Sequence, residues 1–584
     1  MRKYLALSIL VSFTVIISGC SFNAMNNSQS FSLDKNQKKI VAKYVYDLVD
    51  SYFTKKEVKV PSEIAKVSRD YYRIYLTFYI DGKTRCSQSG SAKLKSQDRI
   101  SDDLKEAVKN CIEEKRFDGP IKNSEYKNID IAIDVLYNQQ NLNFYSLDDL
   151  KKEFELGIDA LRIEQDGKGA NFKSSVPITK NYTHKALFEN LCKKANLDLN
   201  CYTKDDVSKY KYNDLAYYAP KNGEIVDLYR YNILVDENSI NQDRIYKSIA
   251  GGYEWYKKQV DENGIVRYLY LPSINQYPKD DNDVRRMATN WAVTELMDFL
   301  KNDEMRSSVD KTLDRYLANK KTNQSGAYIE INGNANIAYN AFAIMALINS
   351  PDYPDSDKLA EELASAIVGT QQENGSYKID FIKDDSGGVD YYPGEAMLAL
   401  MKFYEKNKDK KYLESVEKAF NYYRNYWREN KNTAFIPWHS QAYLILYNAT
   451  ENKELADFVF EMNDWIIDND QQFKNKYSDY IGGFKERPSN STASYLEGIN
   501  DAYALAKEVG DMNHASKYSK SIRAGARFVM QTQYIADNTF YLENSQKAIG
   551  GFRQSPINNS QRDDYTQHAT LSLIKTYANN VYNP

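Results

Sequence analysis

Two of the four histidines in the chain stand in matching places. His439 in PWHSQAY and His568 in RDDYTQHA each lie near the start of an apolar helical segment. An imidazole with a pKa of about 6.5 takes or gives a proton at neutral pH, so two of them beside one sugar carbon could exchange its proton from opposite faces. The alternative is that each ring caps or packs the end of its helix. The pair is therefore a hypothesis for a proton-transferring site.

Acidic residues suggest a second chemistry. Glu395 in YYPGEA, with Asp563 or Asp564 in QRDDY, could act as acid and base in glycoside hydrolysis. That reaction needs two carboxyl groups about 5 to 9.5 Å apart. Glu395 also has a simpler interpretation, because an acid in the first turn after Pro393 stabilises the helix dipole. The candidate catalytic residues are Glu395, His439, Asp563 and His568.

Other polar and aromatic residues stand at or just before the starts of the same helical segments. Positive helix N-termini around a common pocket favour anionic ligands. We expect Arg285, Arg553 and Arg562 to hold carboxylates and the tyrosines to stack on sugar rings. The candidate substrate-binding residues are Arg285, Asn290, Asp390, Tyr391, Tyr392, Trp438, Tyr495, Glu497, Arg553, Arg562 and Asp564.

No metal ion or cofactor is expected at these residues. The sequence has no His-Glu-x-x-His motif, and its last cysteine, Cys201, precedes the helical repeat. The acid-rich stretch 279–283 is expected to be a solvated turn, with a weak calcium site as the alternative.

A repeat of helices must position these residues. From about residue 241, small and apolar segments alternate with Lys- and Glu-rich amphipathic ones, which is typical of an inner and an outer ring. The expected inner segments are 287–300, 335–349, 393–404, 438–447, 493–506 and 567–578, and the expected outer segments are 244–257, 305–319, 358–371, 412–429, 454–468 and 515–532. Twelve such segments predict an (α/α)6 toroid. A linear solenoid of helical hairpins is the alternative.

The first part of the chain mixes strand and helix patterns, so we expect a multidomain protein with an α+β domain over 38–235 before a toroid over 240–584. Residues 68–81 and 129–137 have strand patterns, whereas 100–114 and 184–195 have helical spacing.

The segments IDIAIDVLY, LGIDALRIEQDGKGANFKSSVPITK and HKALFENLCKKANLD resemble the AMMECR-like domain family. That family has a glycine-cysteine stretch where this chain has Thr84-Arg85-Cys86-Ser87. The resemblance therefore implies a fold more than a reaction.

The segments GGFR, YYPGEA and RDDYTQHA resemble a set of bacterial toroids near the glucuronyl epimerases, within the six-hairpin carbohydrate-active group. The resemblance implies a polysaccharide or envelope glycan as partner and an epimerase or glycoside hydrolase as activity. A non-catalytic surface module that binds glycan or protein is the rival expectation, since a fold does not define a function.

The N-terminus resembles a bacterial lipoprotein signal. Arg2 and Lys3 precede an apolar run over 4–17, and Ile17-Ser18-Gly19-Cys20 resembles a lipobox. We expect a signal peptide over 1–19, a lipid on Cys20 and a tether over 20–37, which would hold the protein on the outer membrane or cell surface, outside the cytoplasm. An uncleaved membrane helix is the alternative, although the run is shorter than the roughly 20 residues that a spanning helix needs.

Charge and cysteine content bear on nucleic acid as a partner and on disulfide bonds. The formal net charge is -3, with both signs intermixed, which gives no reason to expect nucleic acid. The four cysteines after Cys20 could form two disulfides with three possible connectivities, or remain buried thiols. The sequence does not define an oligomeric state.

Overall fold

The structure is a computed structural model that describes residues 31–67, 70–91, 99–144, 146–385 and 387–582. Cys20, the predicted signal peptide and the first part of the predicted tether lie outside the described residues. Helix α1 (Lys35–Thr54) begins within the last part of that tether, where Asp34 accepts a hydrogen bond from the Gln37 backbone and caps the helix. Among the described residues, no helix has both the length and the apolar character needed to cross a membrane.

The N-terminal region is built on an antiparallel sheet with strand order β2-β1-β3-β6-β4-β5, and a short seventh strand pairs with β6. The strands are β1 (Arg73–Ile80), β2 (Lys83–Ser89), β3 (Asp130–Asn141), β4 (Asp159–Gln165), β5 (Lys168–Phe172), β6 (Ser208–Ala219) and β7 (Val226–Leu228). Helices α1 and α2 (Arg99–Ile112) bury an apolar core against β1 and β3 that includes Val45, Leu104 and Ile131. The predicted α+β class is confirmed.

The other half of this sheet is covered by shorter helices. These are α3 (Leu147–Glu153), α4 (Ser175–Thr179) and α5 (His184–Lys194). Leu187, Phe188 and Leu191 of α5 pack on Leu161 and Ile163 of β4. The spacing of the three α5 residues places them on one helix face, so the helix covers the strand with an apolar stripe.

Two disulfides pair the four cysteines of this region. Cys86 in β2 is bonded to Cys111 in α2, and Cys192 in α5 is bonded to Cys201. Each bond joins elements that are close in sequence, and the structure thereby selects one of the three connectivities that the sequence left open.

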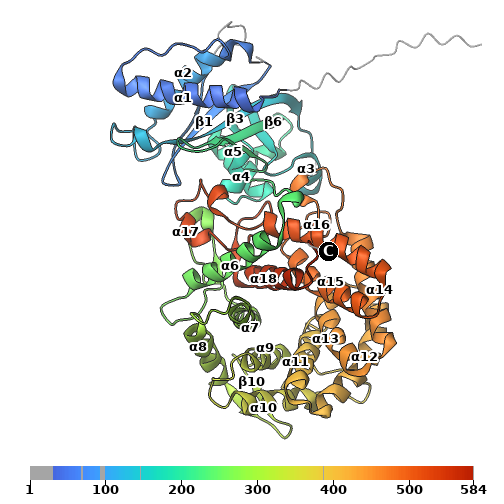
Figure 1. Cartoon of the computed structure of the whole chain (residues 1–584). Coiled ribbons are helices and arrows are strands. Elements are labelled where there is room, and N and C mark those ends of the chain that lie inside the picture. Colours follow the sequence, from blue (N-terminus) through green and yellow to red (C-terminus); the bar gives the residue numbers. More distant parts are fainter. Residues whose placement is uncertain (1–30, 68–69, 92–98, 145, 386, 583–584) are drawn as a thin grey trace, which may run out of the picture.

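Twelve helices of the described chain form a closed double ring, which confirms the (α/α)6 toroid over the solenoid (Figure 1). The inner helices are α7 (Asp283–Leu300), α9 (Ile337–Ile348), α11 (Tyr392–Asn407), α13 (Phe435–Thr450), α15 (Ser491–Glu508) and α18 (Asp563–Ala578). The outer helices are α6 (Gln242–Gln259), α8 (Arg306–Leu317), α10 (Ser356–Gly369), α12 (Lys410–Glu429), α14 (Lys453–Asp470) and α16 (Met512–Gln531). Each inner helix contacts the next, and α18 contacts α7, so the ring closes.

Four short strands and one short α-helix lie in the loops between the ring helices. The strands are β8 (Leu269–Tyr270), β9 (Lys320–Thr322), β10 (Ala327–Ile329) and β11 (Gln561–Arg562), and α17 (Ser545–Ala548) is a short helix. Strand β11 pairs with β8, which ties the segment before the last inner helix to the segment after the first outer one.

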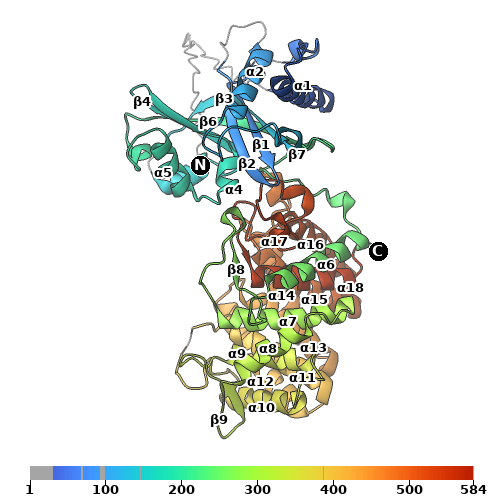
Figure 2. The ribbon, with the colours of Figure 1, turned by 90° about the vertical axis from the view of Figure 1, so that its left-hand side faces the viewer.

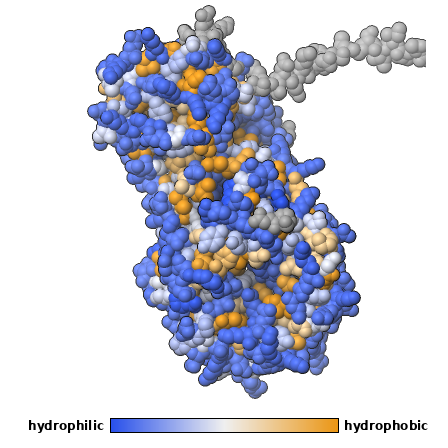
Figure 3. Space-filling view, viewed as in Figure 1, coloured by the Kyte–Doolittle hydropathy of each residue, from blue (hydrophilic) through white to orange (hydrophobic). Residues whose placement is uncertain are grey.

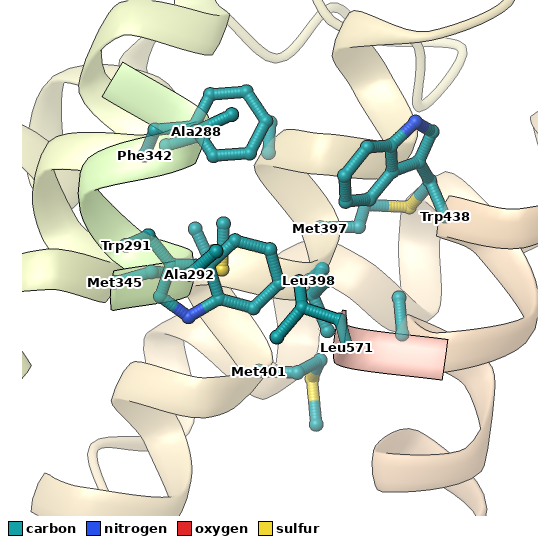
Figure 4. Close-up of a cluster of buried hydrophobic side chains, with 14 of the residues drawn as sticks. Ala288, Trp291, Ala292, Phe342, Met345, Met397, Leu398, Met401, Trp438 and Leu571 are labelled. Carbon is teal, nitrogen blue, oxygen red and sulfur yellow. The ribbon is translucent and has the colours of Figure 1, made fainter. Parts of the chain in front are cut away.

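The composition of each helix explains its ring. Every residue of α9 from Ile337 to Leu347 is buried, whereas α12 buries only one face, which includes Tyr412, Phe420 and Tyr423. At the centre of the ring, the aromatic rings of Trp291, Phe342 and Trp438 lie against one another (Figure 4). All three side chains are buried and belong to the apolar core of the ring.

The two regions share a buried interface, and the sheet domain lies beyond one side of the ring (Figure 2). Arg230, between the sheet and the ring, donates to Glu155 at 2.7 Å and to Asp479 at 2.6 Å, and all three side chains are buried. Phe540 of the toroid stacks on Tyr218 of β6, with ring centroids 4.1 Å apart. Since a broken buried ion pair is costly, these contacts hold the regions in one orientation.

Candidate active site

A cavity of about 660 Å³ opens where the N-terminal ends of five inner helices converge. Its walls come from α7, α11, α13, α15 and α18 and from the loops that precede them, while Phe342 of α9 contributes to its floor. Nine of the predicted site residues line this cavity: Arg285, Tyr391, Tyr392, Glu395, Trp438, Tyr495, Arg562, Asp564 and His568. The structure therefore brings nine of the fifteen predicted site residues together in one cavity at the starts of the inner helices. We call this cavity the toroid pocket.

Glu395 provides a buried carboxyl group in the toroid pocket. It lies in the first turn of α11, is 5% exposed, and its Oε2 has no hydrogen-bond partner among the described residues. Burial raises the pKa of Glu395 to about 8, although the charge of Arg285 opposes the shift. The side chain therefore holds a proton at neutral pH and can donate it to a ligand.

Gly394 allows α11 to approach α13 closely beside this carboxyl group. A Cβ at Gly394 would lie 2.7 Å from the Nδ1 of His439 and 2.7 Å from the Cβ of Trp438. Any larger residue would push the start of α11 away from α13. The glycine of the YYPGEA motif thus positions Glu395 against the wall that carries Trp438.

His568 forms a pair with a buried carboxylate. Its Nδ1 lies 2.7 Å from Oε1 of Glu497 on α15, and the two side chains are 17% and 1% exposed. Burial lowers the pKa of His568, but the charge and the hydrogen bond of Glu497 raise it by more, so the pKa is raised. A carboxylate on one ring nitrogen fixes the tautomer and leaves the other nitrogen for proton transfer.

Cations outnumber ionised acids around the toroid pocket. Asp564 lies 2.7 Å from Nη2 of Arg562 and 3.2 Å from Nε of Arg285, so one carboxylate holds two guanidinium groups. Lys485 adds a third cation, from the loop before α15. Since Glu395 is protonated, the pocket favours an anionic ligand.

Aromatic side chains give the toroid pocket flat apolar walls. Tyr391 is 47% exposed, and Tyr392, Trp438, Tyr495 and Tyr565 also line the cavity. The rings of Trp438 and His568 lie 5.9 Å apart, edge to face. Flat rings beside a few hydrogen-bonding groups suit the faces and hydroxyls of a sugar.

His439 does not line the toroid pocket. It is fully buried, stacks on Phe435, and its Nδ1 lies 2.8 Å from the Phe435 carbonyl oxygen. Burial lowers the pKa of His439 to about 3, so the ring is neutral. The expected pair of histidines on opposite faces of one sugar is therefore not brought together, and His439 packs the end of α13 instead.

Five further predicted residues also lie outside the pocket lining, and one of them, Glu497, is bonded to the lining residue His568. Asp563 is fully buried, and burial with the nearby charge of Asp564 raises its pKa well above the ordinary value. Asn290 donates to the Val309 carbonyl, and Asp390 accepts from Tyr426 and Asn432. Arg553 is 1% exposed and donates to the carbonyl of Gln531. The partners of Asn290, Asp390 and Arg553 belong to the protein, so these three side chains stabilise the loops and helix ends. The Oδ1 of Asp563 accepts from the Asp564 backbone N–H, and its Oδ2 has no partner among the described residues.

Gln567 is a lining residue that the sequence did not single out. It is 1% exposed, and neither its Oε1 nor its Nε2 has a hydrogen-bond partner among the described residues. A buried amide without partners is costly unless a ligand satisfies it. A glutamine in a helix is usually solvated, so the residue type did not indicate a role in the site. The position of Gln567 directly before His568 was the one feature of the sequence that could have indicated it.

Among the residues that the structure describes, no group of three or more His, Cys, Asp or Glu side chains could hold a metal ion.

The N-terminal region resembles a known protein family in sequence. The model of the AMMECR1 family matches residues 43–217. No curated protein matches the chain significantly in sequence.

Solved structures similar to this chain include an uncharacterized protein from Pyrococcus horikoshii, 18% identical, which covers 34% of this chain and 98% of its own with a TM-score of 0.30. A family 76 glycoside hydrolase from a bovine Bacteroides thetaiotaomicron strain is 9% identical and covers 77% of this chain and 96% of its own, with a TM-score of 0.44. A cellobiose 2-epimerase from Spirochaeta thermophila is 11% identical and covers 58% and 96%, with a TM-score of 0.43. The chain thus joins an AMMECR1 domain, matched over residues 43–217, to an (α/α)6 toroid.

Proposed function

We propose that the toroid is a carbohydrate-active enzyme that binds an anionic glycan and exchanges a proton at a sugar carbon, as an epimerase does. One observation carries the proposal: a single cavity holds the buried, unpartnered carboxyl group of Glu395 and the imidazole that Glu497 orients. Helices α11 and α18 lie three positions apart around the six-membered inner ring. Their side chains therefore reach a bound sugar from opposite sides.

The proposed steps use only groups of this chain. The neutral imidazole of His568 takes the proton from a carbon next to the sugar carboxylate, and the negative charge spreads into that carboxylate. Arg285, Arg562 and Lys485 stabilise the charge that develops. Glu395 then gives its proton to the opposite face of the same carbon, which inverts the centre. Exchange with water restores both groups, so no bond of the glycan chain is broken.

Hydrolysis is the second candidate, because Glu395 and Asp564 both line the pocket. A hydrolase would use Glu395 as acid and Asp564 as nucleophile or base. Both oxygens of Asp564 are already bonded to guanidinium groups of Arg562 and Arg285, so neither oxygen is free to attack a sugar carbon or a water molecule. This contact ranks hydrolysis behind proton exchange.

We also propose that a lipid on Cys20 holds the protein outside the cytoplasm, where the partner is envelope polysaccharide. The lipobox-like sequence before Cys20 supports this location. The Cys86–Cys111 and Cys192–Cys201 disulfides support it too, since disulfides persist in oxidising compartments.

The test incubates the chain from Ser21 onward with uronate-containing glycans in heavy water. Epimerisation predicts deuterium at a sugar carbon without new reducing ends, measured by NMR and mass spectrometry. New reducing ends without deuterium would favour hydrolysis instead. Retention of glycan with neither change would leave a binding module and contradict catalysis. Glu395→Gln should lower turnover by roughly 10²-fold or more, while Glu417→Gln, on the exposed face of α12, should keep it.

A further inference from the structure

A second cavity, of about 500 Å³, lies between the AMMECR1 domain and the toroid. On one side it is lined by α3, by the start of α5 and by the loop before α5. On the other side it is lined by the toroid loops that precede α15 and α18. We call it the junction cavity. Figure 3 shows hydrophobic side chains gathered where the two regions meet.

The junction cavity adjoins the toroid pocket. Ser489 and Gln554 line both cavities. They belong to the matched loops GGFKERPSN and GGFRQSPIN, and the backbone N–H of Asn490 donates to the Gln554 carbonyl at 2.8 Å. The two loops therefore form one joined ridge with a cavity on each side.

The chemistry of the junction cavity resembles that of the toroid pocket. Its described lining has the cations Lys151, Lys185 and Arg487 and no acidic side chain. Lys151 is paired at 2.8 Å with Asp148, which is not a lining residue. Lys185 is exposed, and its ammonium group lies 3.8 Å from the carboxylate of Glu189. An exposed ion pair at this distance contributes little binding energy, so Lys185 remains available to an anionic ligand. Arg487 pairs with Glu155 at 3.1 Å, but its Nη1 has no hydrogen-bond partner among the described residues.

Apolar groups complete the lining of the junction cavity. Leu147 is 39% exposed, and Tyr182, Pro488 and Ile557 line the same cavity. Tyrosine and aliphatic side chains between cations suit the apolar faces of sugar rings that carry acidic groups.

The walls of the junction cavity are held in place. Asn559 donates its backbone N–H to the side chain of Asn181 at 2.9 Å and its Nδ2 to the Ile178 carbonyl at 2.8 Å. The buried Arg230 bridge to Glu155 and Asp479 lies in the same junction. The cavity is thus formed before a ligand arrives, which lowers the cost of binding.

We propose that the junction cavity is a distal subsite that holds further residues of the same anionic glycan chain whose reacting residue lies in the toroid pocket. The proposal rests on the proposed function and gives the AMMECR1 domain a task, which is to lengthen the binding site. It follows that the protein prefers a polymer over a short oligosaccharide, because only a longer chain can occupy both cavities.

The test compares dimers and octamers of galacturonic acid with the full chain, by calorimetric titration and by turnover. Lys185→Glu should weaken octamer binding about tenfold or more and leave dimer binding unchanged, since repulsion acts only on residues in the junction cavity. The matched control is Lys193→Glu, which makes the same charge change at an exposed position of α5 that does not line the cavity. Tyr182→Ala should act like Lys185→Glu without changing charge.

The outcomes separate the subsite from the reaction. If the octamer loses affinity in Lys185→Glu but no glycan is turned over, the subsite stands and the proposed reaction falls. If Lys185→Glu and Lys193→Glu change octamer binding equally, or if dimer and octamer bind equally well, the subsite is overturned while turnover can still be observed. Failure of both glycans to bind would overturn both proposals.

Discussion

Helices α13 and α18 each present a histidine within their first two turns, yet the two rings lie in opposite environments. His439 lies among Phe435, Tyr423 and Tyr443, and its Nδ1 meets the Phe435 carbonyl oxygen where that of His568 meets a carboxylate. His568 lies at the pocket wall with Glu497 on its Nδ1. Burial lowers the pKa of His439 to about 3, whereas Glu497 outweighs burial and raises the pKa of His568.

The difference shows that equivalent positions in a repeat need not have equivalent roles. A histidine becomes a base at neutral pH only if its neighbours leave one nitrogen free and orient the other. In this ring that neighbour comes from the preceding inner helix, α15, and α11 supplies no such carboxylate to α13. The hypothesis that His439 and His568 act together is thus replaced by a site with one histidine, His568, and the carboxylate of Glu497.

The largest expected effect separates the two histidines directly. His568→Gln should lower kcat by about 10²- to 10⁴-fold, because it removes the proposed base. His439→Gln should leave kcat within a few-fold, since the amide can still bond the Phe435 carbonyl. Steady-state turnover of the glycan checks both, with circular dichroism to verify folding. Equal losses in both variants would break the comparison.

Glu395→Gln should lower kcat by roughly 10²-fold or more, because the amide has the size of the acid but no proton to give. In the unchanged protein, turnover should fall as the pH rises past about 8, where the proton of Glu395 is lost. A pH profile of kcat/KM measures this fall, which is the basic limb of the profile. If the limb persists in the residual activity of Glu395→Gln, another group is the acid.

Glu497→Gln should lower kcat about tenfold, a smaller effect, because Glu497 positions His568 and does not touch the substrate. Without the carboxylate the pKa of His568 falls, so the acid limb of kcat/KM should move to lower pH. A merely structural role for Glu497 would lower the rate without moving the limb. Glu497→Asp should restore part of the rate if it can still reach the imidazole.

The smallest expected effects are on the free energy of unfolding. Its dependence on pH has opposite signs for His439 and for Glu395. His439 is neutral when folded but titrates near 6.5 when unfolded, so its contribution rises with pH between about 3 and 6.5. Glu395 is protonated when folded but ionises near 4.5 when unfolded, so its contribution falls with rising pH between 4.5 and about 8. Each slope is at most on the order of 1.4 kcal/mol per pH unit.

Urea unfolding over a pH series measures both slopes. His439→Gln should flatten the rise at acid pH, and Glu395→Gln should flatten the fall toward pH 8. Unchanged curves in either variant would show that the group is not buried in the charge state described.

Much of the fold was accessible from the sequence because its signals are local. Alternation of wholly apolar and amphipathic segments predicts inner and outer helices, and each predicted inner segment overlaps an inner helix. The strand pattern of 129–137 overlaps β3, which begins at Asp130, for the same reason, since β3 is buried through its centre. The lipid on Cys20 stays a prediction.

The site was predictable only in part. Which residues stand at the helix starts follows from local sequence patterns, because periodicity and turn glycines are properties of neighbouring residues. The contact of Glu497 with His568 and the burial of His439 could not be predicted in this way, since both depend on contacts between helices. The meeting of Ser489 and Gln554 with the AMMECR1 domain was decided in the same way. Burial and charge pairing are set by packing in space, and no local pattern records them.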